Sequence, residues 1–299
     1  MSWIRDSTLN FFQMLAVKIV KTGKVPKHVA FIMDGNRRYA DKKNVAGLQG
    51  HTAGFDKLAE TLQWCLDLGI KIVTVYAFSI ENFKRTKKEV DDLIELAVEK
   101  FQRLLDEKDK LMEHGVRVNI VGNMSLIPDR LRKLMAEAMT ITKDNNKAML
   151  NVAFAYTSRD EMTETIKTLT DGVCKQEINP ADIDEDVFTK CMYTYQSPPP
   201  DLLIRTSGEV RFSDFLLWQI SHSYIYFANV LWPEFNIWNL LTAVFHYQRS
   251  YDDLNKSESK KYSYNQTVFS TCANKYVNNL HDKRHIILEN LASQNAVKS

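Results

Sequence analysis

Six short apolar runs, alternating with segments of helical periodicity, constrain the fold of this chain most strongly. The runs are rich in β-branched and aromatic residues and cover residues 29–33, 72–78, 116–121, 150–155, 201–204 and 224–227. Between them, apolar residues recur at three- and four-residue spacing over residues 50–68, 87–114, 131–138, 162–173 and 240–248. Continuous apolar runs are typical of strands buried on both faces, and alternating strands and helices imply parallel pairing. The pattern predicts a single α/β domain with a central six-stranded, mostly parallel sheet flanked by helices.

Composition excludes several other classes of protein. The 299 residues are 44% hydrophobic and 25% charged, with a formal net charge of +2, which is typical of a globular protein. A near-neutral charge balance gives no basis for general nucleic-acid binding, so we expect no nucleic-acid partner. The four cysteines are widely separated without a C-x-x-C spacing, which favours reduced thiols over a disulfide framework or a zinc site.

The two ends of the chain differ from its middle. The pattern in residues 1–24 predicts an amphipathic helix. Its apolar face, which we expect to dock on the protein's own core, comprises Phe11, Phe12, Leu15, Ile19 and Val20. Contact of this helix with a membrane surface is the alternative, because Trp3 and the nearby lysines suit an interface. Residues 25–250 form the predicted main domain, and residues 251–299 a polar, partly helical tail that begins with a loose linker. No stretch approaches the roughly 20 apolar residues that span a bilayer.

Chemically distinctive residues follow the first apolar run. Asp34, Gly35, Asn36, Arg37 and Arg38 come directly after a predicted buried strand. Ligands of open α/β sheets bind beyond the carboxyl ends of the strands. Mg²⁺ is commonly bound by one or two carboxylates together with substrate phosphates, and arginine binds phosphate oxygens in a two-pronged fashion. The segment therefore suggests a metal ion facing a polyanion, with a solvated turn and a surface ion pair as the alternative.

A second polar cluster follows the fifth run. Residues 205–213 include Arg205, Arg211 and Ser213, and Arg85 follows another predicted strand. A structural interpretation would pair Arg205 with Glu209. However, the carboxyl ends of parallel strands meet at one edge of a sheet, so both clusters should lie on the same rim. Two arginine-rich clusters on one edge suggest a pocket for two phosphorylated groups.

Five stretches, in this order, also point to a known family. They are Asp34 to Ala40, Gly50-His51, Tyr76 to Ser79 with Asn82 and Arg85, Arg205 to Ser213, and Leu231 to Phe235. Together they resemble the motifs of cis-prenyltransferases, the undecaprenyl diphosphate synthase family, and most of all its eukaryotic catalytic subunits. The resemblance covers residues of about 25 to 250 and implies a catalytic domain with a hydrophobic tunnel between sheet and helices. It implies condensation of isopentenyl diphosphate onto farnesyl-type allylic diphosphate, giving long-chain dehydrodolichyl diphosphate for dolichol synthesis and protein glycosylation.

The resemblance also implies a role for each site residue. Asp34 would hold the Mg²⁺ cofactor, and Asn36, Ser79 and Asn82 would form the catalytic polar network near the departing proton. The allylic diphosphate pocket would comprise Gly35, Arg37, Arg38, His51, Phe83 and Arg85. Isopentenyl diphosphate would be held by Arg205, Arg211 and Ser213. Apolar residues of the long helix would line the tunnel.

Departures from the family pattern predict a heteromer. Gly47 stands where the family commonly has an arginine near the allylic diphosphate, and Tyr224 stands where bacterial homodimeric members carry a glutamate. The sequence ends without the Arg-x-Gly tail that completes a neighbouring active site. The resemblance therefore implies a non-catalytic accessory subunit of the same fold, similar to the Nogo-B receptor. It also implies peripheral membrane contact at the cytosolic face of the endoplasmic reticulum. The alternative is that this chain is itself the non-catalytic scaffold, which would be expected to lack the aspartate and arginines.

Overall fold

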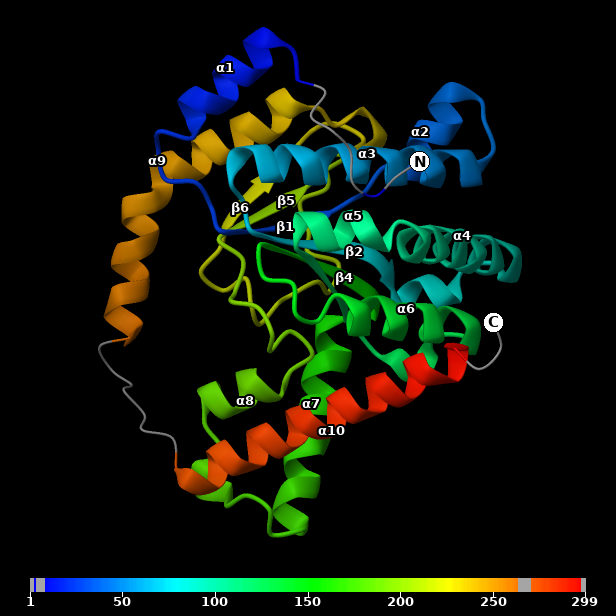
Figure 1. Cartoon of the computed structure of the whole chain (residues 1–299). Helices are drawn as coiled ribbons and strands as arrows, with labels where there is room; N and C mark the ends of the chain where they lie inside the picture. Colours follow the sequence, from blue (N-terminus) through cyan, green and yellow to red (C-terminus); the bar gives the residue numbers. More distant parts are fainter. Residues whose placement is uncertain (1–2, 4–8, 263–269, 297–299) are drawn as a thin grey trace.

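The computed structural model describes Trp3, residues 9–262 and residues 270–296, and within these residues six strands form one sheet (Figure 1). The strands are β1 His28–Ile32, β2 Ile72–Ser79, β3 Val116–Val121, β4 Ala148–Tyr156, β5 Leu202–Arg205 and β6 Tyr224–Phe227. Their spatial order is β3-β4-β2-β1-β5-β6, and every neighbouring pair is parallel. The predicted six-stranded α/β fold is therefore confirmed.

Helices cover the sheet because its strands are apolar on both faces. The described helices are α1 Phe11–Val20, α2 Asn36–Lys43, α3 Gly47–Leu68, α4 Lys87–Asp106, α5 Lys108–His114, α6 Asp129–Ile141, α7 Ser158–Cys174, α8 Glu185–Cys191, α9 Ile237–Tyr262 and α10 Thr271–Ala296. Phe31 and Val75 face a large core with residues of α3, α4, α6 and α9. Ile32 and Ala153 face a smaller core on the other side, closed by residues 215–220. Helix α10 lies against α6 and α8 and crosses α7 (Figure 1).

Two helix boundaries differ from the prediction. The single helix expected over residues 87–114 is two helices, because the backbone of Glu107 leaves helical geometry at φ −98° and ψ 19°. The segment after Ser250, expected to be a loose linker, continues α9 to Tyr262 without a break at this point. The part of the expected linker that falls on residues 263–269 lies outside the described residues.

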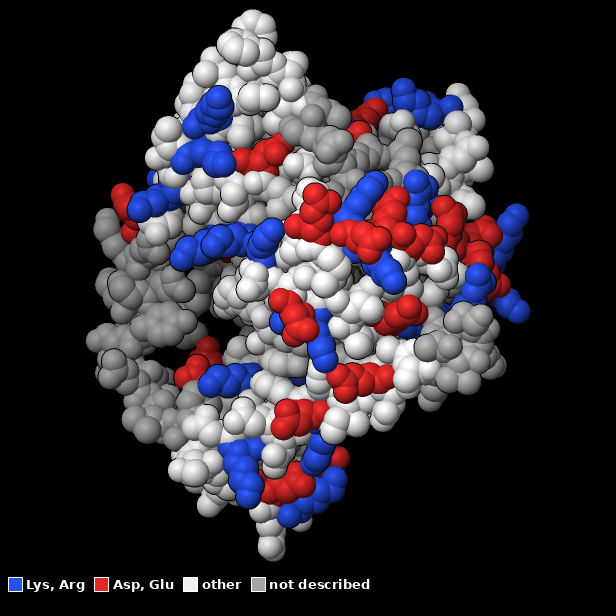
Figure 2. Space-filling model, in the orientation of Figure 1, with Lys and Arg blue, Asp and Glu red and all other residues white. Residues whose placement is uncertain are grey.

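The amino-terminal helix docks by a different face from the one expected. The side chains of Phe11, Phe12, Leu15 and Ile19 are exposed rather than packed on the core. The face that packs on the core comprises Ala16, Val17 and Val20, of which Val20 alone was expected to dock. The part of the molecule formed by α1 carries few charges at its tip (Figure 2). No described helix is both long and apolar enough to cross a membrane.

Candidate active site

The two predicted polar clusters meet at Asp34. Strand β1 pairs with β5 so that Ile32 lies opposite Arg205, which brings the residues beyond both strand ends together. Arg205 Nη2 donates a hydrogen bond to Asp34 Oδ2 at 2.9 Å, and Arg38 Nη2 lies 3.7 Å from Asp34 Oδ1. The Asp34 side chain is 34% exposed, whereas that of Arg205 is 2% exposed. Asp34 therefore lies on the open side of the pair and remains accessible to a ligand.

Glycines hold α2 close to its neighbours. Gly35 begins the turn into α2 with φ +113°, a conformation that L side chains rarely adopt, and its hydrogens face Leu231. In α3, a Cβ on Gly50 would lie 2.3 Å from the backbone oxygen of Asn36, and one on Gly54 would lie 2.3 Å from Asn36 Oδ1. The first turn of α2 therefore rests directly on α3, and this contact fixes the Asn36 side chain beside the sheet edge.

The second cluster is organised around buried Arg205. Its Nη1 donates to Ser213 Oγ at 2.8 Å and to the backbone oxygen of Arg211. Arg205 does not pair with Glu209, which was the structural alternative, because Glu209 pairs with Arg211. Ser213 has φ +49°, a strained conformation for a residue with a side chain, which the bond from Arg205 helps to maintain.

A third group lies at the end of β2 and the start of α4. Ser79 and Asn82 cap the 3₁₀ helix η1 Ile80–Lys84: Ser79 N donates to Asn82 Oδ1 at 2.9 Å, and Glu81 N donates to Ser79 Oγ at 3.1 Å. Phe83 packs edge-on against Phe78, with ring centres 4.9 Å apart. The capping bonds and this ring contact fix the turn, so its side chains need little further ordering when a ligand binds.

Glu89 joins this group to the first cluster. Arg85 Nη1 donates to Glu89 Oε1 at 2.7 Å, and Arg37 Nη1 lies 3.9 Å from the same oxygen. Glu89 was not among the residues predicted from the sequence. Its spacing from Thr86, the residue that caps α4, matches an S/T-x-x-E capping pattern and could have drawn attention to it.

His51 is a neutral base between these groups. Burial, followed by the nearby positive charge of Arg85, lowers the pKa of His51 to about 4. Its Nε2 is buried without a hydrogen-bond partner among the described residues, and the same is true of Asn36 Oδ1. Buried polar atoms are rarely left unpaired. Two such atoms beside the arginine clusters indicate a place where a ligand supplies the missing contacts.

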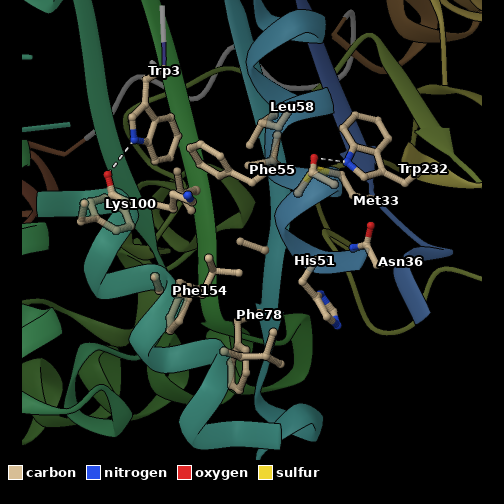
Figure 3. A pocket seen from close by; sticks show the side chains of 18 residues that line it. Trp3, Met33, Asn36, His51, Phe55, Leu58, Phe78, Lys100, Phe154 and Trp232 are labelled. Carbon is tan, nitrogen blue, oxygen red and sulfur yellow. Dashed lines mark hydrogen bonds between the residues drawn. The ribbon is translucent and has the colours of Figure 1, made fainter. Parts of the chain in front are cut away.

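An apolar cavity of about 130 Å³ begins beside these two atoms (Figure 3). Its walls come from α3, α4, β2 and β4, and they are mostly aliphatic and aromatic. Asn36 and His51 line one side, and Trp3 and Lys100 lie on the opposite side of the view. Trp232 closes the wall near Asn36, and its Nε1 donates to the backbone oxygen of Gly54 at 2.7 Å. The cavity lies between sheet and helices, where the family resemblance placed a tunnel.

The donor set fits a metal ion shared with a substrate better than one held by protein alone. Among the described residues, no group of three or more His, Cys, Asp or Glu side chains is placed to hold a metal ion. Asp34 contributes one partly exposed carboxylate beside two arginines. Mg²⁺ is bound in this way when phosphate oxygens supply further ligands, so the residues present fit a Mg²⁺–diphosphate complex.

Several of the predicted residues thus form two sets of contacts along one rim. Contacts link Asp34, Arg38, Arg205 and Ser213, and a second set links Arg37 and Arg85 through Glu89. Lys100, in the cavity wall, was missed because a lysine within a helical pattern predicts a solvent-exposed position.

Comparisons with known proteins agree with this geometry. The family profile described as "Putative undecaprenyl diphosphate synthase" matches residues 32–254. A human protein, "Dehydrodolichyl diphosphate synthase complex subunit DHDDS", is 54% identical over 257 residues, which are 86% of this chain and 77% of the relative. A "Tritrans,polycis-undecaprenyl-diphosphate synthase (geranylgeranyl-diphosphate specific)" of Pyrococcus furiosus is 42% identical over 80% of this chain and 90% of the relative.

A solved structure supports the same conclusion. Lavandulyl diphosphate synthase from Lavandula x intermedia, in complex with dimethylallyl diphosphate, superposes with a TM-score of 0.71 at 32% sequence identity. The match covers 75% of this chain and 95% of the plant enzyme. The profile match, the relatives and this fold together show that the chain belongs to the undecaprenyl diphosphate synthase family of cis-prenyltransferases.

Proposed function

We propose that this chain is the catalytic subunit of a dehydrodolichyl diphosphate synthase. It condenses isopentenyl diphosphate units onto farnesyl diphosphate, or a similar allylic primer, and its long-chain product serves dolichol synthesis and protein glycosylation. The observation that carries the proposal is the Asp34–Arg205 contact, which joins two arginine clusters into one site beside an apolar cavity. A site of this kind suits two diphosphates and one hydrocarbon tail.

The residues suggest how the condensation proceeds. Arg37 and Arg38 hold the diphosphate of the primer, and Arg211 and Ser213 hold that of isopentenyl diphosphate. The isopentenyl double bond attacks the allylic carbon of the primer while the bond from that carbon to the diphosphate oxygen breaks and diphosphate leaves. A proton then leaves the isopentenyl unit. Holding two reactants in the correct orientation can contribute about 7 kcal/mol or more to lowering the barrier.

Asp34 supports departure of the diphosphate. A Mg²⁺ ion bound by Asp34 and diphosphate oxygens would supply Lewis-acid stabilisation of the negative charge on the leaving group. Arg38 lies beside Asp34 and adds positive charge at the same place. His51 is neutral at pH 7 because its pKa is lowered to about 4, so it can accept a hydrogen bond without adding a cation. Asn36, Ser79 and Asn82 provide polar contacts near the departing proton, and His51 belongs to the pocket of the allylic diphosphate.

The assembly we propose is a heteromer at the cytosolic face of the endoplasmic reticulum, with an accessory subunit of the same fold. Two observations support it. The human relative is named a complex subunit, and the family resemblance implies that Tyr224 stands where bacterial homodimeric members carry a glutamate. Peripheral membrane contact through α1 is supported by the exposed rings of Phe11 and Phe12. The alternative of a non-catalytic scaffold is disfavoured because Asp34 and its arginines form a connected site.

The proposal is tested by Mg²⁺-dependent incorporation of radiolabelled isopentenyl diphosphate into farnesyl diphosphate, with and without an accessory subunit. Asp34→Asn is the matched inactive variant. It removes the charge but keeps an oxygen to accept from Arg205, which is 2% exposed and should not lose this partner. We expect turnover to fall to background while the melting temperature changes little. A fully active Asp34→Asn variant would refute the catalytic role of the carboxylate.

A further inference from the structure

Lys100 places a cation in an otherwise apolar cavity wall. It lies on α4, and its side chain is only 8% exposed. Its Nζ contacts Glu99 Oε1 at 2.9 Å and lies 5.0 Å from the centre of the Phe55 ring, close enough for a cation–π interaction. Lysine is almost never fully buried unless it is paired, and its long side chain usually extends to water. Its position in the wall therefore calls for a physical explanation.

The cation lies at the end of the cavity away from the diphosphate site. Figure 3 shows Lys100 and Trp3 on the side opposite Asn36 and His51. Trp3 Nε1 donates to the backbone oxygen of Lys100 at 2.8 Å, and the Trp3 ring meets the Phe55 ring at a centre distance of 4.7 Å. Phe55, Lys100 and Trp3 therefore form the distal wall together.

A growing prenyl tail has to displace part of this wall. The cavity measures about 130 Å³, whereas a pocket for a drug-sized ligand takes roughly 300 Å³ or more. A tail that displaces Phe55 also takes the aromatic face away from the Lys100 ammonium and leaves hydrocarbon in its place. An ammonium group that loses a favourable neighbour and gains only hydrocarbon is destabilised. This unfavourable contribution to binding arises only when the tail reaches Lys100, so it does not affect the binding of short tails.

We propose that Lys100 is a specificity-determining residue for the prenyl tail. Its ammonium opposes the passage of hydrocarbon beyond Phe55 and so limits the length of tail that the protein binds and extends. The inference rests on the proposed function, since it assumes that the cavity receives the prenyl tail. It makes opposite predictions for two variants. Lys100→Met removes the charge at similar size and should favour longer tails. Glu99→Gln removes the counter-ion and should favour shorter ones.

The chain offers a matched control in Lys57. This lysine of α3 contacts Glu60 at 2.5 Å and lies 5.4 Å from the centre of the Trp64 ring, so its surroundings resemble those of Lys100. It does not line the cavity. Lys57→Met therefore removes a similar cation–π lysine without changing the distal wall.

The test is displacement of a fluorescent farnesyl diphosphate analogue by farnesyl, geranylgeranyl and longer prenyl diphosphates. It is made on the protein alone and with its accessory subunit, and it requires no turnover. We expect Lys100→Met to bind the longer ligands about three- to tenfold more tightly, with farnesyl diphosphate unchanged. Glu99→Gln should bind the longer ligands more weakly, and Lys57→Met should match the wild type. The product lengths of the active protein should shift in the same directions.

An unchanged preference for tail length in Lys100→Met, or an equal change in Lys57→Met, overturns the inference. A uniform loss of affinity for every tail also overturns it, since that outcome shows a packing role alone. If Lys100→Met does not fold, Glu99→Gln decides, because Glu99 is largely exposed and its substitution leaves the core intact. A protein that binds tails with the expected length dependence but condenses nothing would refute the proposed function and leave this inference standing.

Discussion

Replacing Gly54 with alanine tests whether Asn36 has to be held in place for catalysis. The new Cβ would lie 2.3 Å from Asn36 Oδ1 and 3.1 Å from Trp232 Cδ1, whereas ordinary van der Waals contact begins at 3.4 Å. The amide oxygen has to retreat by about 1 Å. Asn36 Oδ1 has no hydrogen-bond partner among the described residues. We therefore expect the Asn36 side chain to change its position, while α2 and α3 stay in contact.

The expected effect is large on turnover and small on stability. A misplacement of about 1 Å can lower a rate by about 10²-fold, equivalent to about 2.7 kcal/mol in the activation barrier. Alanine gains about 1 kcal/mol over glycine within a helix, which offsets part of the steric cost. Steady-state turnover of farnesyl and isopentenyl diphosphates and urea unfolding measure the two quantities. Gly47→Ala is the control, because this glycine of α3 has no neighbouring atom within 4 Å of an added Cβ.

Two outcomes would contradict this reasoning. Turnover of Gly54→Ala equal to that of Gly47→Ala would show that Asn36 need not occupy its present position. A collapse of the free energy of unfolding together with activity would show instead that Gly54 serves the packing of α2 on α3.

Three further predictions concern other parts of the molecule. Arg211→Ala should raise the KM for isopentenyl diphosphate more than the KM for farnesyl diphosphate, because it removes a charge-assisted contact of about 1.5–3 kcal/mol. An equal rise in both KM values would contradict two separate diphosphate sites. Gly47→Arg should tighten farnesyl diphosphate binding or leave it unchanged, because no atom lies within 4 Å of a Cβ added at this position. Weaker binding in a folded variant would show that another group occupies that space. Burial lowers the pKa of His28 from 6.5 to about 4, so the unfolded state binds more protons between these values, and stability falls as the pH drops. His28 alone should lower the free energy of unfolding by about 2 kcal/mol between pH 7 and 5, and urea unfolding of His28→Gln should show a correspondingly smaller fall.

The sequence was sufficient to predict the sheet because its signals are local. The runs that became β1 and β2 are apolar and partly β-branched, and each is followed by residues that cannot continue a buried strand. The break at Glu107 was missed because no glycine or proline marks it, although the five residues between Leu105 and Leu111 are all polar and interrupt the apolar spacing. The extension of α9 to Tyr262 was missed because polar residues such as Asp252 favour a loop on composition alone.

The site could be predicted in composition but not in its pairings. Asp34 and Arg205 were expected on one rim because parallel strands end at the same edge of a sheet. Which partner each charge takes depends on tertiary packing. Arg211 pairs with Glu209, and Arg205 turns inward to Asp34. Lys100 is the clearest case, because its place in the cavity wall depends on Phe55, a residue of another helix.

The central claim is that this chain forms new cis double bonds by condensing isopentenyl diphosphate. The most direct measurement is the length and double-bond geometry of products made from farnesyl diphosphate, isopentenyl diphosphate and Mg²⁺, by the chain alone and co-expressed with an accessory subunit. We predict long-chain polyprenyl diphosphates with new cis bonds, made much faster by the complex. Products with only trans bonds, or no incorporation with either preparation, would contradict the claim.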